Sequence, residues 1–471
     1  MSFKWRYLGA SALICALAVA AGASRGQSLH DALAEAYTTN PGLKAARAQL
    51  RATDENFAQA RSSLLPTLSA GGSVSNSVSK FFQPGVSADE SPIGFPQPDI
   101  NIKNETTTYS ANLTASQTIF EGGRNWNAIR QAQAQIRAGR ADLTTAEQQV
   151  LLAAVTAYAD VLRDEAVLRL SENNVQVLQR QLQAARDRFE VGEVTRTDVA
   201  QAEARLSGAE ANQITARGQL ETSRAAYVRV VGSAPGALEP LPPLPPLPAT
   251  LEEARTLALR ANPAMRSARE QEAASSRGVA VAKGALLPSI STDITYSLSD
   301  EPVLFDTKRE ATTATARVSV PIFSGGANYS RIRQARQQNN QFRMLLREQH
   351  RLTEEEATNA WEALQTARAT IAAARQQVRA NEIAYEGVEQ EALVGSRTTL
   401  DVLDAEQELL DSRVALVRAR RDEAVAAYRV LAAVGALTAA DLGLDVDLYD
   451  PERNARAAQW KLIGLKGVEE E

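Results

Sequence analysis

The 471-residue chain has few of the residues on which enzyme chemistry and covalent cross-linking depend. It contains one cysteine, Cys15, and two histidines, His30 and His350, which stand far apart in the sequence. One cysteine cannot form an internal disulfide, and isolated histidines do not make a metal or catalytic cluster. The sequence also lacks a glycine-rich phosphate loop and a nucleophile elbow. We therefore expect a protein that is not an enzyme and binds neither cofactor nor metal.

The sequence also lacks a large excess of charge of one sign, and it lacks long apolar runs after the N-terminal leader. The 51 basic and 56 acidic residues give a net charge of −5, and no basic tract indicates nucleic acid as a partner. Beyond the N-terminal leader no stretch approaches the roughly 18 apolar residues of a membrane-spanning helix. Aromatic residues make up only 5%, while alanine, glutamine, arginine and glutamate dominate. This composition is typical of long helices packed through small side chains.

Residues 1–23 have the pattern of a secretory signal peptide. Lys4 and Arg6 precede an apolar run that ends at Ala21, and small residues follow as far as Ala23. The alternative is a membrane anchor, but the apolar run is shorter than the roughly 20 residues that a helical span needs. Cleavage after Ala23 would remove Cys15 and leave a mature chain without cysteine.

The second half of the chain repeats the first. Asn40-Pro41 recurs as Asn262-Pro263, and Ile119-Phe120 before two glycines recurs as Ile322-Phe323. The spacing between these motifs is longer in the first copy, so an insertion lies between Pro66 and Phe120. A duplicated unit predicts one architecture built twice. We divide the chain into a first repeat over 24–235, a proline-rich linker over 236–249, a second repeat over 250–442 and a polar tail over 443–471.

Each repeat contains two segments in which apolar residues alternate with serine, threonine or asparagine. In the first segment Leu68, Ala70 and Val74 alternate with hydroxyl side chains. This period of two, over about ten residues, is typical of strands in an outer-membrane barrel. A soluble antiparallel sheet with one wet face is the alternative. The four predicted strands cover 67–78, 108–119, 289–298 and 313–322.

A heptad pattern follows the second strand of each repeat. It predicts a coiled-coil helix from Arg124 to Glu190, with a second copy in the other repeat. At 1.5 Å per residue such a helix is about 100 Å long. Asp164 and Ser171 are the exceptions in the first apolar seam. The alanines of the seam allow the helices to approach closely.

Shorter helices complete each repeat. We expect helices from Pro41 and Pro263, because asparagine before proline begins a helix, and they should end before Leu65-Pro66 and Leu287-Pro288. Glycine at the hairpin turns should end the long helices, and Thr197-Asp198 and Thr399–Asp401 should cap the returning ones.

Four strands cannot form a closed sheet within one chain. Open strand edges cannot be satisfied in hydrocarbon, so a membrane-spanning sheet must close. Two chains would give eight strands, whose interior is filled by side chains, whereas three give twelve strands and a lumen. The pattern therefore predicts a trimer, with the long helices continuing the wall of the strands.

The most specific motifs are Val394-Gly395-Ser396-Arg397-Thr398 and Asp401-Val402-Leu403-Asp404-Ala405. With them, the chain from Ser28 to Leu442 resembles the TolC family of outer-membrane efflux and type I secretion channels. The resemblance implies a mainly α fold with a membrane β-barrel. Each chain would give four β-strands to a 12-stranded barrel in a homotrimer. Antiparallel coiled coils would form a long α-barrel, so the protein would lie in the cell outer membrane with a large periplasmic portion.

The resemblance also implies a function. Family members are the exit duct of tripartite efflux or type I protein secretion systems. They are passive conduits with a periplasmic gate that is opened by engagement of the other components. The partners would be a periplasmic adaptor (membrane fusion protein), an inner-membrane pump (ABC transporter or proton-driven transporter) and outer-membrane lipid. The cargo stays open between protein, toxin and drug, although the overall similarity favours the secretion and general efflux branch. A structural periplasmic coiled-coil protein without channel activity is the alternative, which explains the heptads but not the strand pairs.

The family's functional residues correspond to two groups in this sequence. Asp401 and Asp404 match the aspartates of an acidic ring at the periplasmic entrance, where like-charge repulsion would raise their apparent pKa values. The alternative is a helix cap and a solvated first-turn acid. Arg397 matches a gate-closing residue that would contact Asp198 and Thr197.

The resemblance also assigns the two hairpin turns to contact with the adaptor. The turn residues are Val191, Gly192, Glu193, Val394, Gly395 and Ser396. In the family a small or apolar residue normally follows Val-Gly, so Glu193 and Ser396 are departures that indicate a different adaptor specificity. The family's aromatic gate position falls on Ala392. The first strand loop, over 79–107, is expected outside the cell.

Overall fold

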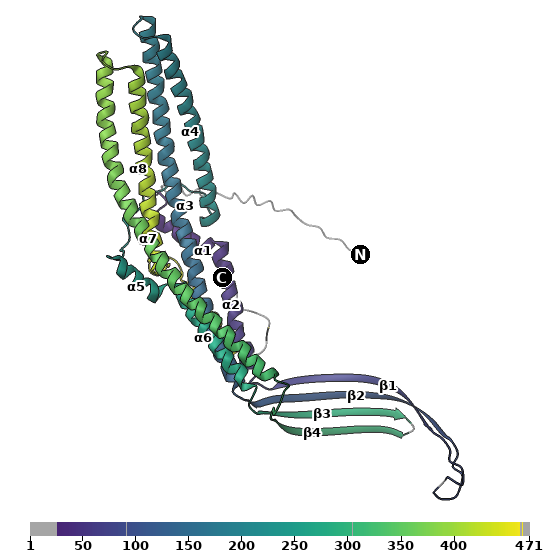
Figure 1. The fold of residues 1–471 in the computed structure, drawn as a ribbon. Helices are drawn as coiled ribbons and strands as arrows, with labels where there is room; N and C mark the ends of the chain where they lie inside the picture. Colours follow the sequence, from purple (N-terminus) through teal and green to yellow (C-terminus); the bar gives the residue numbers. More distant parts are fainter. Residues whose placement is uncertain (1–25, 91, 304, 462–463, 465–471) are drawn as a thin grey trace, which may run out of the picture. The chain divides into compact units, whose positions relative to one another are not determined.

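The computed structural model describes residues 26–90, 92–303, 305–461 and 464. The predicted signal peptide lies outside these residues. The elements of the first repeat are α1 (Leu29–Thr39), α2 (Pro41–Ser62), β1 (Thr67–Gln83), β2 (Ile100–Glu121), α3 (Arg124–Glu190) and α4 (Arg196–Val231). The second repeat has the same order in α5 (Leu251–Ala261), α6 (Pro263–Gly284), β3 (Ser289–Val303), β4 (Phe305–Ser319), α7 (Ala327–Leu393) and α8 (Thr399–Ala433) (Figure 1). A short helix, α9 (Arg453–Ala458), follows.

The chain folds into two compact units, each built from both halves of the sequence. The hairpin unit contains the described residues of Met1–Asn40, Leu151–Pro246 and Leu364–Tyr428. The sheet unit contains those of Pro41–Val150, Leu247–Ala363 and Arg429–Glu471. The helices α3 and α7, of 67 residues each, contribute their first part to the sheet unit and the remainder to the hairpin unit.

The helices of the described part of the chain are amphipathic or polar. None of them has an apolar stretch of the length and hydrophobicity that crossing a membrane requires.

The strands form one antiparallel sheet in the order β1-β2-β3-β4. All four predicted strands are present, but their predicted lengths are wrong. β1 continues to Gln83 and β2 begins at Ile100, so the predicted loop over 79–107 shrinks to the residues between them. The pairing continues because the ladder joins backbone groups and does not require apolar side chains. In this extension Ser79 pairs with Asn104 and Lys80 with Lys103.

The second strand pair also differs from its prediction. β3 continues to Val303, and β4 begins at Phe305 and ends at Ser319. The predicted end at residue 322 fails because Pro321 has no N–H group to donate to the ladder. In β2 a register shift between Thr118 and Phe120 marks a β-bulge near the end of the strand.

The helix ends follow the sequence signals to within a turn. α3 has the predicted bounds, Arg124–Glu190. α2 and α6 end at Ser62 and Gly284, slightly before the expected positions. The N–H of Leu64 then donates to the carbonyl of Arg61 at 2.9 Å, a tighter turn that ends the helix ahead of Pro66.

The duplicated Asn-Pro motif performs the same task in both repeats. Asn40 Nδ2 donates to the carbonyl of Val230 at 2.9 Å, at the end of α4. Asn262 Nδ2 donates to the carbonyl of Ala433 at 3.1 Å, at the end of α8. Each asparagine therefore satisfies a backbone carbonyl that the end of a long helix leaves without a partner.

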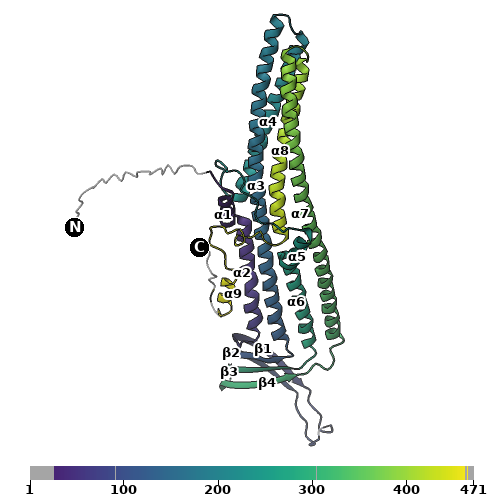
Figure 2. The same cartoon turned by 90° about the vertical axis from the view of Figure 1, so that its left-hand side faces the viewer.

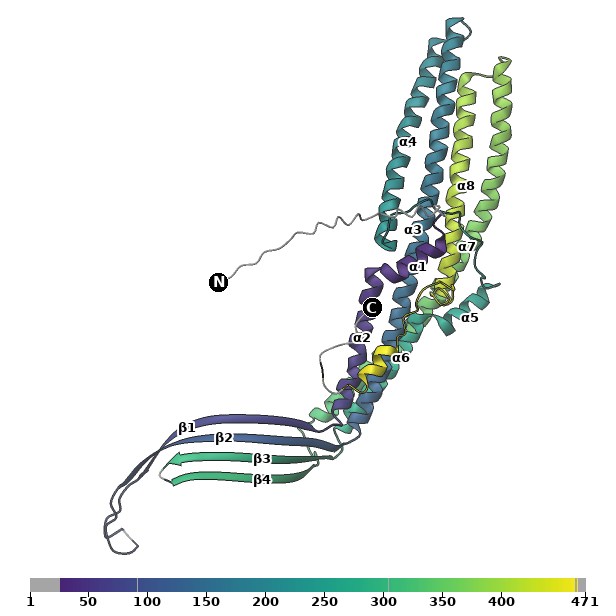
Figure 3. The same ribbon diagram turned by 180° about the vertical axis from the view of Figure 1, so that it is seen from behind.

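The core of the hairpin unit is the predicted apolar seam of α3. Figure 3 shows α3 beside α4 and α7 beside α8. The seam of α3 packs against residues of both α4 and α8. This core cluster comprises Val175, Leu178, Leu182, Ala185, Ala202, Ala209 and Leu403. Close packing through alanines is what the composition indicated.

A buried polar network explains the first break in that seam. Asp164 is 4% exposed and accepts hydrogen bonds from Ser223 on α4 and from the guanidinium of Arg163. Arg163 also donates to Asp160 at 2.7 Å, and Arg421 on α8 donates to the same carboxylate at 2.8 Å. The network joins α3 to α4 and to α8, so at this level polar contacts replace apolar packing.

Candidate functional site

The turn of the first hairpin ends α3 with glycine in the left-handed region. The N–H of Gly192 donates to the carbonyl of Phe189 at 3.0 Å, and that of Glu193 donates to Arg188 at 2.9 Å. Gly192 has φ 79°, a conformation that side chains other than glycine adopt at a cost. Val191 is exposed beside it.

The turn of the second hairpin has the same geometry. The N–H of Gly395 donates to Ala392 at 3.2 Å and that of Ser396 to Glu391 at 3.0 Å. Gly395 has φ 78°, and Val394 is exposed. Each hairpin therefore presents an exposed valine beside the glycine of its turn, which suits a protein contact. Their role as adaptor contacts stays a prediction.

The helices after these turns are capped earlier than the sequence predicted, by two positions at α4 and by one at α8. Thr195 is the N-cap of α4, and its hydroxyl accepts the N–H of Asp198 while the carboxylate of Asp198 accepts the N–H of Thr195. Thr398 and Asp401 repeat this reciprocal pair at α8, at 3.3 and 2.9 Å. The aspartates are therefore the third helical residues of capping boxes, because that spacing lets the carboxylate reach back to the cap.

The capping box lowers the pKa of Asp401. Hydrogen bonds from the backbone and then the side chain of Thr398 hold the pKa of Asp401 below its usual 3.8. Asp404 instead accepts a hydrogen bond from Arg205 on α4, at 2.5 Å. The sequence reasoning missed Arg205, because α4 carries many charged residues and nothing marks this one. An acidic ring needs neighbouring chains, so it and its raised pKa values stay predictions.

The cap can be tested by replacing adjacent threonines. We expect Thr398→Ala to raise the pKa of Asp401 toward 3.8. A carboxyl whose pKa is lower in the folded state stabilises the fold at pH values above its unfolded-state pKa. This contribution is lost as the pH falls through the folded-state pKa. In the wild-type protein, protection of the start of α8 should therefore persist to a lower pH than in Thr398→Ala. Hydrogen exchange followed by mass spectrometry measures this. Thr399→Ala is the control, and equal effects of the two replacements would contradict the assignment.

Arg397 does not contact its predicted partners within one chain. Its Nε donates to Glu391 Oε2 at 2.8 Å, across the same turn. Asp198 is engaged with Thr195. Glu391 lies only six residues before Arg397, so this pairing orders little additional chain. The contact of Arg397 with Asp198 and Thr197 stays a prediction for the assembled protein.

A cavity of about 270 Å³ lies beside the turns, between α3 and the second hairpin. Ala392 is part of its lining, together with Arg180, Arg188, Glu389 and Val402. Ala392 is the position at which the family resemblance expects an aromatic residue. A small side chain there leaves space between the hairpins.

Neither face of the sheet is covered along β1, where residues of both faces are exposed. The apolar face is exposed, with Val74 at 67% and Val318 at 65%. On the other face the hydroxyls of Ser73 and Ser110 lie 2.8 Å apart across β1 and β2. The hydroxyl face is thus satisfied across the strands, whereas the apolar face has no cover in a single chain. A large exposed apolar surface marks a contact with lipid or protein.

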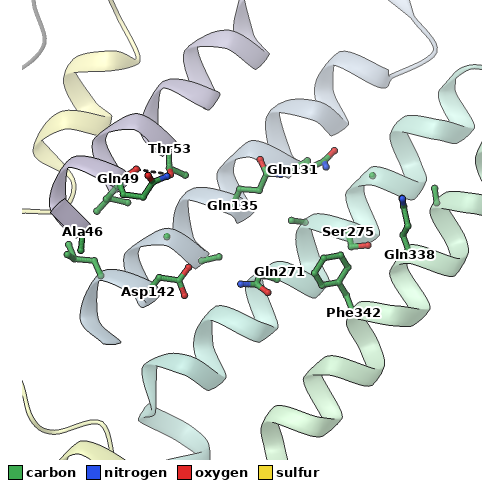
Figure 4. A pocket seen from close by; sticks show the side chains of 17 residues that line it. Ala46, Gln49, Thr53, Gln131, Gln135, Asp142, Gln271, Ser275, Gln338 and Phe342 are labelled. Atoms are coloured by element: carbon green, nitrogen blue, oxygen red, sulfur yellow. Dashed lines mark hydrogen bonds between the residues drawn. The ribbon is translucent and has the colours of Figure 1, made fainter. Parts of the chain in front are cut away.

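A second cavity, of about 600 Å³, lies among α2, α3, α6 and α7 in the sheet unit. Glutamines from all four helices contribute to its lining, as the labelled side chains of Figure 4 show. These residues are Gln49, Gln131, Gln135, Gln271 and Gln338. Neutral amides both donate and accept hydrogen bonds, so this wall is polar, and Asp142 is the one ionisable side chain among the lining residues.

The comparison with protein families matches both repeats. The model of the family "Outer membrane efflux protein" covers residues 32–233 and 254–436. Outer membrane efflux protein BepC of Brucella suis is 34% identical over 462 residues, which are 98% of this chain and 96% of the relative. The chain therefore belongs to the outer membrane efflux protein family, and it is a protein of the outer membrane.

More distant relatives and solved structures agree with this assignment. Proteases secretion protein PrtF of Dickeya chrysanthemi is 26% identical, over 85% of this chain and 86% of its own length. The fold matches that of the CusC channel with a TM-score of 0.75 at 19% identity, covering 87% of this chain and 92% of that structure. The Campylobacter jejuni CmeC outer membrane channel gives a TM-score of 0.74 at 20% identity, over 92% and 89%. The predicted family and fold class are confirmed.

Proposed function

We propose that this chain is the exit duct of a tripartite efflux or type I protein secretion system, and that it works as a homotrimer. The exposed apolar face of the sheet is the observation that carries the proposal. In a membrane this face contacts lipid, and the hydroxyl face lines a lumen. The duct transports without catalysis, as the channel and transport proteins of its family do.

The edges of the sheet support three chains. Among the described residues, β1 and β4 each pair on one side only, so both present open edges. Three chains of four strands close these edges into a 12-stranded barrel with a lumen. The glutamine-lined wall of the sheet unit would continue the lumen toward the periplasm as part of an α-barrel. Cross-linking of the purified protein to a trimer, together with conductance in planar bilayers, tests the assembly. A monomer without conductance would favour the structural coiled-coil alternative.

The hairpin turns and the names of the relatives support the proposed partners. The exposed valines of the two turns are a pair of matched contacts for the tip of a periplasmic adaptor. An inner-membrane pump, either an ABC transporter or a proton-driven transporter, would supply the energy that a passive duct lacks. The names of the relatives include both efflux and protease secretion, which supports either kind of system.

The acidic ring predicts ion selectivity. In the proposed trimer Asp401 and Asp404 supply six carboxylates near the periplasmic entrance, which attract cations. Replacing both by asparagine should lower the permeability of cations relative to anions, measured as the reversal potential in planar bilayers under a salt gradient. Asp411→Asn, which removes an exposed charge further along α8, is the control. An unchanged reversal potential in the double variant would exclude the ring.

Three single variants distinguish the two contacts by which Arg397 could hold the gate closed, one with Asp198 and one with Glu391. Arg397→Ser should raise single-channel conductance if Arg397 holds the entrance closed. If the holding contact is with Asp198 of the assembled protein, Asp198→Asn should raise conductance as well, and Glu391→Gln should not. If the observed contact with Glu391 holds the entrance closed instead, Glu391→Gln should raise conductance and Asp198→Asn should not. Unchanged conductance in Arg397→Ser would remove the arginine from the gate.

A further inference from the structure

The residues after α8 fold back along α2 in the sheet unit. Figure 2 shows α9 beside α2, toward the end at which the sheet begins. Asn454 on α9 donates to Asp54 on α2 at 3.0 Å, and both side chains are buried. Arg140 on α3 donates to Glu452 at 2.8 Å. These contacts fix a segment for which the sequence predicted only a polar tail.

Gln459 lies beside the junction of α2 and the sheet. Arg61, in the last turn of α2, donates to the carbonyl of Gln459 at 2.5 Å. A few residues further on, the carbonyl of Leu64 accepts a hydrogen bond from Gln117 on β2 at 2.7 Å. The contacts of Arg61 therefore hold the end of the C-terminal segment near the base of the strands.

Trp460 is held there and remains exposed. The guanidinium of Arg61 lies 4.9 Å from the centre of the indole ring, yet Trp460 is 76% exposed. A second tryptophan, Trp126, is 64% exposed at the start of α3. Its neighbour Asn125 donates to the carbonyl of Ser63 at 3.4 Å, at the same junction. Two ordered and exposed tryptophans at one level are unusual on a surface that faces only water, and tryptophan is enriched where membrane meets water.

Two cations lie next to Trp460, namely Arg61 over its ring and Lys461 as the following residue of the chain. In the described part of the chain Arg453 and Lys461 are exposed, and neither side chain has an ion-pair partner. The nearby carboxylates are engaged, since Asp450 pairs with Arg456 and Glu452 with Arg140. The cations available at this surface can therefore meet phosphate groups from outside the protein.

We propose that Trp460, Arg61 and Lys461 form an interfacial anchor that binds anionic phospholipid headgroups on the periplasmic side of the outer membrane. The proposal rests on the proposed function, because it requires the sheet to span the membrane. The indole ring would lie at the headgroup level and the cations would contact phosphates. The anchor fixes the depth of the sheet and ties α9 to the membrane surface.

Fluorescence of single-tryptophan variants tests the anchor. In the full-length protein from which the signal peptide has been removed, Trp126 and Trp361 are replaced by Phe, so that Trp460 is the one remaining source of tryptophan fluorescence. This variant is reconstituted in vesicles of phosphatidylglycerol and phosphatidylcholine. We expect brominated lipid to reduce the emission of Trp460, most strongly with bromine near the headgroup. Strong quenching by iodide in water with no effect of bromine would overturn the proposal. Protection from both quenchers would also overturn it and would place Trp460 against a second copy of the chain.

A reporter in the sheet separates this test from that of the proposed function. Val74→Trp, with Trp126, Trp361 and Trp460 replaced by Phe, reports insertion of the apolar face. Quenching of this reporter without quenching of Trp460 overturns the anchor alone. Absence of quenching at both positions overturns the membrane-spanning sheet.

Lipid charge gives a second readout. Quenching of Trp460 by brominated phosphatidylglycerol should exceed that by brominated phosphatidylcholine, and Lys461→Gln should reduce this difference. Arg260→Gln, with an exposed arginine at the end of α5, is the control. Equal quenching by both lipids in the parent protein would remove the anionic headgroup from the proposal.

Discussion

Replacing Leu113 by arginine is expected to prevent stable insertion of the protein in the outer membrane. Leu113 lies on the apolar face of β2, between Ala70 of β1 and Tyr296 of β3. It is near the middle of the apolar part of the sheet. A cation on the lipid face at the bilayer midplane costs about 2–4 kcal/mol per site. Three sites in a trimer would multiply that cost.

The adjacent residue provides the control. Asn112 lies on the hydroxyl face of the same strand, so Asn112→Arg would point into the lumen of the proposed barrel. The amount of each variant that resists carbonate extraction from outer-membrane fractions measures insertion. We expect little of the Leu113→Arg variant to resist extraction, whereas the amount of Asn112→Arg should be close to that of the wild-type protein. The opposite order would mean that the hydroxyl face contacts lipid, and equal amounts would mean that the sheet does not span the membrane.

Replacing Asp164 by alanine is expected to cause a large loss of stability in the hairpin unit. The change leaves Ser223 and part of the Arg163 guanidinium without an acceptor in a buried site. Removing one partner of a buried ion pair costs about 3–5 kcal/mol, and the remaining contact of Arg163 with Asp160 places this case near the lower end. Chemical denaturation of the detergent-solubilised protein, followed by circular dichroism, measures the change in the free energy of unfolding.

Ser171 is the matched control because it is the other polar residue in the same seam. Its hydroxyl donates to the carbonyl of Val167 in its own helix at 3.0 Å. Such a bond within the helix contributes little to stability, so we expect Ser171→Ala to change the unfolding free energy by less than about 1 kcal/mol. Similar losses of unfolding free energy in both variants would show that the contact between the helices at Asp164 does not stabilise the hairpin unit more than a bond within one helix does.

Most of the helical framework could be predicted from sequence because its signals are local. The heptad of α3 begins after two glycines and ends before Gly192, and both of its predicted bounds are the observed ones. Alternation identified all four strands, since a period of two is visible within ten residues. Their ends were wrong because polar residues pair through the backbone as well as apolar ones do.

The site was less predictable because its contacts are pairs chosen among many charged side chains, some close in the chain and others far apart. The motif around Arg397 identified the hairpin turns, but not that Arg397 pairs with Glu391 or that Arg205 pairs with Asp404. Many charged residues occur on these helices, and no periodic pattern ranks one partner above another. Asp164 was visible as an interruption of the seam, but its partners Ser223 and Arg163 were not.

Periodicity and turn residues along the sequence were sufficient for the helices and the existence of the strands, because each depends on neighbours within one or two turns. The recurrence of short motifs indicated the duplication, and the resemblance of such motifs indicated the family. Packing in three dimensions was needed for the strand lengths, the network at Asp164 and the place of Trp460 beside Arg61. These depend on which surfaces meet, and the free energy of that choice is shared among residues tens to hundreds of positions apart.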